Sequence, residues 1–254
     1  MSNVQSVNRA IAIIKKLGGL KDGISVTNLS NDLDLNISTV YRLLKTLRED
    51  GIVAQNETTL RYSLGVGFLE IALNYLGSMD LMKAASQHMK VLQEKTGETV
   101  NLALIDGFEV VYIDRIESNQ DLRHSISIGK KAPVHCTSLG KAIIAFMDRE
   151  VISDRLSKTP LQKNTIFTKD SFEEIMADLN EIQKTKVAVD DREHQEHIRC
   201  VGSPIFDIRG NVVAAVSVSG PISRVTYEKL EELKREIKKT AQLISVDLGW
   251  VETK

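Results

Sequence analysis

The sequence has few cysteines, no long apolar run and almost no net charge, and each shortage excludes a class of protein. Two cysteines, Cys136 and Cys200, are too few for a disulfide framework. The longest apolar runs, residues 10–14 and 212–216, are far shorter than the roughly 20 residues that cross a bilayer, and no secretion pattern opens the chain. We therefore expect a cytoplasmic protein with no membrane partner.

Charge and composition exclude further classes. A net charge of −1 argues against a chain that coats nucleic acid non-specifically. With 42% hydrophobic and 26% charged residues, the chain is neither disordered nor fibrous. Its 254 residues exceed the commonest size of a single domain, about 100–150 residues, which favours two domains. Residues 1–62 hold eight basic and six acidic side chains, so DNA binding by this segment has to be argued from geometry.

Three short helices are predicted in the first 50 residues, because apolar residues recur there at steps of three and four. Gly18-Gly19 ends the first helix, Thr27 is the expected N-cap of the second, and Asp50-Gly51 ends the third. Two strands at 52–54 and 60–62 surround a polar tip and predict a hairpin, the wing. The apolar positions of the helices are Val7, Ala10, Ile11, Ile14 and Leu17; Leu29 and Leu33; and Val40, Leu43, Leu44 and Leu47.

The third predicted helix has an outer face suited to a DNA groove. Hydroxyls and an aromatic ring near its start can reach base edges, while the cations further along can neutralise phosphates. The same pattern also occurs in small domains that bind no DNA, where the cations are simply exposed to solvent. The predicted DNA-binding residues are Arg9, Thr27, Ser38, Thr39, Tyr41, Arg42, Lys45, Arg48 and Arg61.

Several segments carry a family resemblance. They are Gln-Ser-Val-Asn-Arg-Ala at 5–10, Ser-Thr-Val-Tyr-Arg-Leu-Leu at 38–44, Tyr-Ser-Leu-Gly at 62–65, Thr-Gly-Glu-Thr-Val at 96–100, Gly129 to Gly140-Lys141-Ala142, Asp190 to Cys200, and Ser-Val-Ser-Gly-Pro at 217–221. Together, and in this order, they resemble the signatures of IclR-family regulators over nearly the whole chain. The resemblance implies a homodimer, or a dimer of dimers, on a pseudo-palindromic double-stranded DNA operator, with the third helix reading base pairs.

The remainder is predicted to be a helical linker and a second, α+β domain. Phe68, Ile71, Ala72 and Tyr75 keep a helical period in the linker, and an Asp-Gly pair at 106–107 between two apolar runs predicts a hairpin. The resemblance implies a GAF-like effector domain with a curved antiparallel sheet. Strands are expected at 100–105, 109–113, 124–128, 186–190, 201–206 and 212–219, and helices at 81–95, 138–147, 172–184 and 226–248.

A small organic acid is the predicted effector. Residues 132–140 lead into a helix whose free N-terminal amides attract an anion. Ser217 and Ser219 lie on one face of a strand and offer hydroxyl donors, while Asp190 and Cys200 are expected to close the pocket. No cofactor is required. The ligand positions implied by the resemblance are His124, Ala132, Ser138, Leu139, Asp190, Ile198, Cys200, Ser217 and Ser219.

Three other functions compete with this prediction: a metal-responsive regulator, a thiol-dependent enzyme and a ligand carrier. Zinc-binding residue types occur in this region, which would suit a metal-responsive regulator, although their spacing matches no zinc motif. Cys200 near His194 or His197 would suit a thiol-dependent enzyme, but no third, orienting residue is evident. A ligand carrier that never touches DNA would not need the cations of the third helix. The candidate metal ligands are His135, Cys136, Asp191, His194 and Cys200.

The sequence therefore predicts an α+β protein with a winged helix-turn-helix domain at 1–63, a linker helix at 64–78 and an effector-binding and oligomerisation domain at 79–254. We expect a sequence-specific transcription regulator, a repressor rather than an activator, and not an enzyme. Its operator affinity is expected to depend on the acid bound in the second domain.

Overall fold

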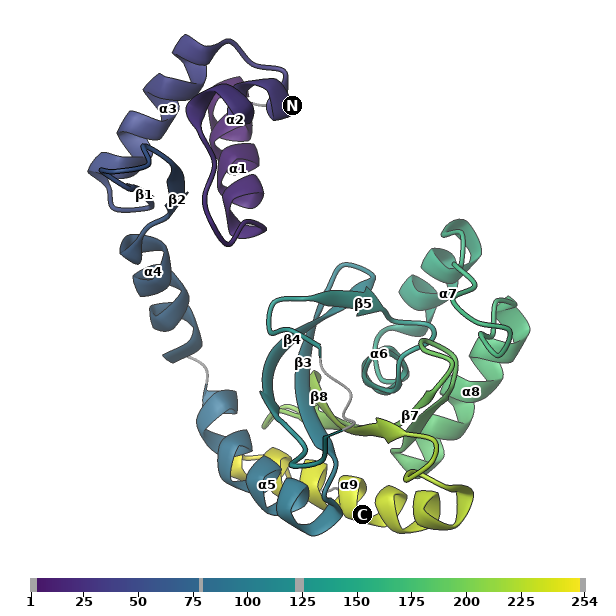
Figure 1. The fold of residues 1–254 in the computed structure, drawn as a ribbon. Coiled ribbons are helices and arrows are strands. Elements are labelled where there is room, and N and C mark those ends of the chain that lie inside the picture. The colour runs from purple at the N-terminus through teal and green to yellow at the C-terminus, as the bar shows by residue number, and fades with distance from the viewer. Residues whose placement is uncertain (1–3, 78–79, 122–125, 252–254) are drawn as a thin grey trace. The chain divides into compact units, whose positions relative to one another are not determined.

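The computed structural model describes residues 4–77, 80–121 and 126–251 and divides the chain into two compact units (Figure 1). The first unit spans Met1–Met79 and the second spans Asp80–Lys254. Within the described ranges, every helix is too short or too polar to pass through a lipid bilayer.

The first unit is a winged helix-turn-helix. Its three leading helices each bury one apolar face, and residues such as Leu17, Leu29 and Leu44 meet in one core that also receives Val53 and Tyr62 from the hairpin. Strands β1 and β2 pair antiparallel. The elements are α1 (Gln5–Gly18), α2 (Val26–Leu33), α3 (Ile37–Glu49), β1 (Val53–Gln55), β2 (Tyr62–Leu64) and α4 (Val66–Gly77).

Two local predictions in this unit are wrong. Ser25 caps α2, because its side chain accepts the backbone N–H of Asn28, whereas Thr27 lies inside the first turn. The second wing strand begins at Tyr62 rather than at residue 60. Leu60 has a φ of 56°, a left-handed conformation that an extended strand does not contain, so the turn continues for two more residues.

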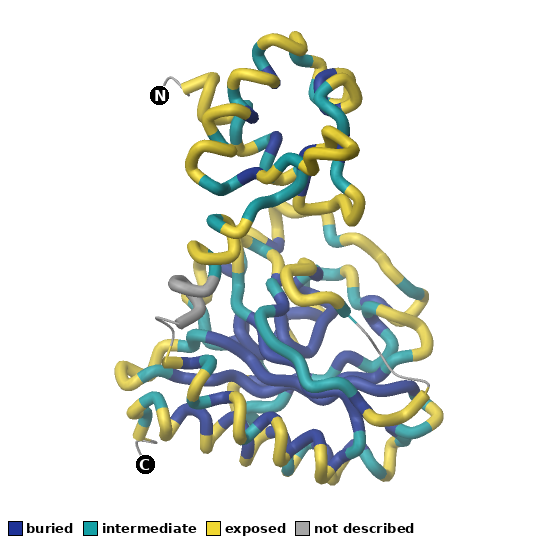
Figure 2. Tube along the Cα trace, turned by 60° about the vertical axis from the view of Figure 1, so that its left-hand side comes forward, coloured by how far each residue is buried: buried dark blue, intermediate teal, exposed yellow. Residues whose placement is uncertain are grey.

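The second unit is a six-stranded antiparallel sheet in the order β5-β4-β3-β8-β7-β6. The sheet curves around α6, while α5 and α9 lie side by side against its other face with their apolar sides buried (Figures 1 and 2). The elements are α5 (Asp80–Thr96), β3 (Thr99–Asp106), β4 (Glu109–Ile116), β5 (Lys131–Pro133), α6 (Ser138–Ile144), α7 (Arg149–Lys158), α8 (Phe172–Thr185), β6 (Ala188–Asp191), β7 (Ile198–Phe206), β8 (Val212–Pro221) and α9 (Tyr227–Asp247).

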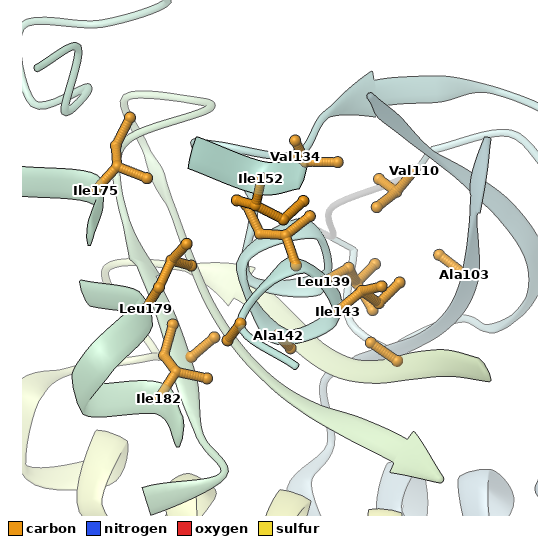
Figure 3. Packing of buried hydrophobic residues seen from close by; sticks show 14 of the residues in the cluster. Ala103, Val110, Val134, Leu139, Ala142, Ile143, Ile152, Ile175, Leu179 and Ile182 are labelled. Atoms are coloured by element: carbon orange, nitrogen blue, oxygen red, sulfur yellow. The ribbon is translucent and has the colours of Figure 1, made fainter. Parts of the chain in front are cut away.

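Two glycines allow α6 to lie unusually close to its neighbours. A Cβ atom at Gly202 on β7 would lie 2.8 Å from the carbonyl oxygen of Ser138, and one at Gly140 would lie 2.3 Å from the Cα atom of Val134. A side chain at either position would push α6 away from the sheet. The apolar side chains of α6 and α8 then fill the inside of the curve (Figure 3), among them Leu139, Ala142, Ile143, Ile175, Leu179 and Ile182.

The α+β fold class is confirmed, and the differences are local. The strand predicted at 124–128 lies partly outside the described residues, and residues 126–128 form no strand. The chain turns at Gly129, whose φ is 82°, and strand β5 begins beyond it at Lys131, where its residue pairing with β4 starts. Helix α7 was not predicted, because Ile152 and Leu156 are its only buried residues and give too short a pattern.

Candidate DNA interface and effector cavity

Helix α3 presents a polar outer face to solvent. Val40 and Leu44 are buried in the core of the first unit, and this orients the opposite side of the helix outward. Tyr41 is 54% exposed, a high value for an aromatic residue. Ser38, Arg42 and Lys45 are also exposed, so the predicted ridge lies on the surface rather than in the core.

The start of α3 adjoins a polar hollow that Arg9 and Thr39 help to line. Asn36 occupies the N-cap position without a side-chain hydrogen bond to the helix. A guanidinium next to helix N-terminal amides suits a phosphate, although the carboxylate of Asp34 also lines the hollow. The complete lining is Arg9, Ser30, Asn31, Asp34, Leu35, Asn36 and Thr39.

The other predicted DNA-binding cations lie at the wing. Arg48 Nη1 donates to Gln55 Oε1 at 2.9 Å, and Gln55 in turn donates to the carbonyl oxygen of Leu60. Arg48 therefore also holds the hairpin against α3. Arg61 is exposed beside the carbonyl oxygens of Asp22 and Gly23, and Thr27 is exposed on α2.

A polar cavity lies in the second unit between the sheet and the start of α6. Three of its residues form a row across neighbouring strands, because Asp190 on β6 is directly opposite Cys200 on β7, which is directly opposite Ser219 on β8. Ser217 follows two positions along β8 and therefore lies on the same face. The cavity is lined by Tyr112, Thr137, Ser138, Leu139, Asp190, His194, Gln195, Ile198, Cys200, Ser217 and Ser219.

The cavity brings together seven of the nine predicted effector residues. Ala132 instead packs in the hydrophobic cluster behind β5, and His124 lies outside the described residues. Sequence reasoning did not assign Tyr112, Thr137, His194 or Gln195 to the effector. His194 and Gln195 lie within the segment 190–200 that carries part of the family resemblance, whereas Tyr112 lies on β4, two strands away from β8 in the sheet order.

The residues of the cavity are tightly packed. The free volume of the cavity is only about 10 Å³, so even a small acid requires the surrounding side chains to separate. Thr137 caps α6 by accepting the N–H of Gly140, which satisfies one of the amides expected to be free. The Ser217 hydroxyl, 1% exposed, and the Asn101 Oδ1 atom have no hydrogen-bond partner within the part of the chain that the structure describes.

Burial controls the ionisation of the cavity residues. It raises the pKa of Asp190 to about 7, with Lys141 opposing and Glu193 reinforcing the shift. Asp190 Oδ1 accepts the backbone N–H groups of Glu193 and His194 at 2.8 and 3.3 Å. Burial also raises the pKa of Cys200 well above its ordinary value. A thiol in this state is a weak nucleophile.

A buried ion network underlies the cavity. Lys141 on α6 is fully buried, and its Nζ lies 2.5 Å from Glu193 Oε1 and 3.0 Å from Asp178 Oδ2. Lys169 Nζ lies 2.6 Å from Asp178 Oδ1. Burial alone would raise the pKa of Asp178, but the two lysines hold it below its usual value, whereas burial of Glu193 leaves its pKa raised. This network connects α6, α8 and the loop after Asp190.

The candidate zinc ligands are separated by other interactions. His135 Nε2 contacts the carbonyl oxygen of Gln162, Asn164 Nδ2 donates to Cys136 Sγ, and Asp191 pairs with Arg199 at 2.8 Å. Among the residues that the structure describes, no three His, Cys, Asp or Glu side chains are placed to hold a metal ion. Burial raises the pKa of Cys136 to about 12. The zinc and thiol-enzyme alternatives therefore gain no support from the geometry.

A chain with a winged helix-turn-helix and a buried polar cavity on a curved sheet has the architecture of a ligand-responsive DNA-binding regulator. Two domain families match the sequence, one for each unit. They are "IclR helix-turn-helix domain" over residues 6–57 and "Bacterial transcriptional regulator IclR C-terminal" over residues 73–246. The chain belongs to the IclR family of transcription regulators, which control DNA binding through small-molecule effectors. This confirms the family resemblance.

The relatives agree with this assignment. The chain is 33% identical to the HTH-type transcriptional regulator KdgR of Dickeya chrysanthemi, over 98% of this chain and 81% of the relative. It is also 33% identical to the HTH-type transcriptional repressor AllR of Escherichia coli K12, over 96% and 90%. These relatives are regulators rather than enzymes. A crystallised IclR homologue from Microbacterium hydrocarbonoxydans, in complex with 4-hydroxybenzoate, shares the fold with a TM-score of 0.86 at 22% identity, over 96% and 99%.

Proposed function

We propose that the chain is a repressor that binds a small carboxylate in the cavity of its second unit and changes its operator affinity when the acid is bound. The observation that carries this proposal is the buried Ser217 hydroxyl, which has no partner in the described structure although burying it without one costs about 1–3 kcal/mol. A ligand oxygen would satisfy it. Ser219 and Tyr112 add further hydroxyls to the same cavity.

The relatives supply supporting analogies. The Microbacterium homologue was crystallised with an aromatic acid, and AllR is a repressor, so an acidic effector and repression are the functions that we assign to this chain. The effector domain occupies residues 79–254, and α4 is part of the linker at 64–78 that transmits the signal. As a regulator of transcription, the protein acts on DNA in the cytoplasm.

We further propose that a homodimer, or a dimer of such dimers, binds a pseudo-palindromic operator through two copies of α3. Helix α4 exposes Phe68, Leu69 and Ile71, an apolar surface that a second copy of the chain would cover. In this proposal Tyr41 and Ser38 contact base edges, and Arg9 of α1, which lines the hollow beside the start of α3, holds a phosphate.

Removing the two strand hydroxyls tests the effector site. A thermal-shift screen of small carboxylates identifies the acid, since a ligand of the native state raises its melting temperature. In Ser217→Ala with Ser219→Ala, we expect calorimetry on the full chain to show affinity for that acid lowered by roughly 100-fold or more, because hydrogen bonds to a charged group contribute about 1.5–3 kcal/mol each and two are lost.

Ser157→Ala is the matched control, because Ser157 is exposed on α7, outside the cavity lining, and its hydroxyl donates to the carbonyl oxygen of Asp154 in the same helix. It should bind the acid as the unchanged protein does. Circular dichroism should show that all variants are folded. Unchanged acid affinity in the folded double variant would mean that the effector binds elsewhere.

A further inference from the structure

Asp190 is a buried carboxylate with no cation of its own in the described structure. Its side chain is 3% exposed, and its hydrogen-bond partners include two backbone N–H groups, both on one carboxylate oxygen. The nearby positive charges are already used: Lys141 contacts both Glu193 and Asp178, and Lys169 contacts Asp178. Two lysines thus pair directly with two other carboxylates, and Lys141 acts on Asp190 only through space, too weakly to offset its burial.

The other groups that face Asp190 do not supply a positive charge at neutral pH. From the sheet, Cys200 and Tyr112 have pKa values raised by burial, as does Cys136 from the loop before α6, so all three are uncharged. Burial lowers the pKa of both His194 and His135, which favours their neutral forms. Glu193 and Lys141 belong to the ion network described above. The carboxylate of an acid that entered the cavity would therefore lie close to the negative charge of Asp190.

We propose that Asp190 takes up a proton from solvent when an acidic ligand binds, and that its neutral carboxyl group then donates a hydrogen bond to the ligand. This inference rests on the proposed function, because it concerns the same cavity. Two carboxylates in a buried cavity repel each other strongly, whereas a carboxyl and a carboxylate share one proton. The effector anion is thus bound together with one proton, which Asp190 holds. The occupancy of the cavity therefore depends on pH as well as on the concentration of the acid.

The sign of the pH effect follows from this linkage. In the free protein the pKa of Asp190 is about 7, and the bound anion raises it further. Ligand affinity is therefore fully present below the free pKa and is lost as pH rises above it. If the carboxyl stays protonated in the complex, the apparent affinity is about tenfold lower at pH 8 than at pH 6.

Calorimetry on the full chain tests the inference with four probes: acetate, glycolate, gluconate and 4-hydroxybenzoate. Each titration is repeated at one pH in buffers with different ionisation enthalpies, and the dependence of the measured heat on the buffer gives the protons taken up. We expect uptake of about 0.5 proton per ligand at pH 7 and about 0.9 at pH 8. The neutral amide of the same acid should bind without taking up a proton.

Two variants identify the group that takes up the proton. Asp190→Asn is a permanent neutral donor, so its ligand affinity should be the same from pH 6 to pH 8, with no proton uptake. His194→Gln removes the imidazole in the cavity, so proton uptake per bound ligand that persists in this variant, whatever its affinity, excludes His194 as the group that takes up the proton. If Asp190→Asn does not fold, the proton count of the unchanged protein and of His194→Gln still decides the question.

The outcomes separate this inference from the proposed function. Acid binding without proton uptake, or a linkage that persists in Asp190→Asn and vanishes in His194→Gln, would overturn the role of Asp190 while leaving carboxylate sensing intact. Failure of all four acids to bind would overturn the proposed effector class, and the proton linkage with it.

Discussion

Replacing Arg42 and Lys45 on α3 by alanine should weaken operator binding and flatten its dependence on salt. Each cation that neutralises a phosphate contributes about 0.9 to the slope of log K against log salt concentration. We therefore expect the slope to fall by about one for each phosphate that is no longer neutralised, and by twice that amount when the change is present in both subunits of a dimer. The affinity of the second unit for its acid should be unchanged.

Gel-shift titrations at several salt concentrations measure this slope. Lys90→Ala is the control, because Lys90 is exposed on α5 in the second unit and should leave the slope as it is. Tyr41→Ala removes an exposed ring from the same helix without removing charge, so it should lower affinity for the operator while the salt slope stays constant. Equal affinity and slope in Arg42→Ala, Lys45→Ala and the unchanged chain would remove α3 from the DNA interface.

Replacing Lys141 by methionine should cause the largest loss of stability in the second unit. The substitution leaves Glu193 without its only ion-pair partner in the described structure and takes one of two lysines from Asp178. Removing one partner of a buried ion pair costs about 3–5 kcal/mol, because the other charge remains buried. Urea unfolding followed by circular dichroism should show this decrease in the free energy of unfolding.

The pH dependence and a second substitution identify the cause. Without the lysine, the pKa of Glu193 should rise further, so the loss of stability should be smaller at lower pH, where more of the carboxyl is protonated, than at pH 8. Adding Glu193→Gln should restore part of the stability. Lys184→Met, at an exposed position of α8, should change stability by less than about 0.5 kcal/mol. A similar loss in both methionine variants would contradict the role of the ion network.

Much of the fold follows from local patterns. The three-four periodicity of Val40, Leu43, Leu44 and Leu47 predicts which face of α3 is buried, and the two-residue period of Ser217 and Ser219 predicts that both lie on one face of their strand. Errors occurred where one residue changes the backbone direction, as at Leu60 and Gly129. Such turns depend on conformations that hydrophobic periodicity does not record.

The electrostatic character of the cavity was not predictable in the same way. Lys141 follows Gly140 in a segment where no local pattern indicates a buried charge. Its partners Asp178 and Glu193 are 37 and 52 residues away in sequence, and only the packing of α6 against α8 and the loop after β6 brings them together. Tyr112 is similar, because it lies on β4, two strands away from β8 in the sheet, and no local pattern indicates that it lines the cavity.

The central claim is that a ligand in the second unit controls the affinity of α3 for DNA. A ligand shifts such an equilibrium only if it binds the DNA-competent and DNA-incompetent forms with different affinity. The most direct measurement is a gel-shift titration of the full chain on its operator, with and without the acid found by thermal shift. For a repressor, saturating acid should move the binding midpoint to higher protein concentration in the unchanged chain, and not in Ser217→Ala with Ser219→Ala. An acid that binds by calorimetry while the midpoint stays in place would contradict the account.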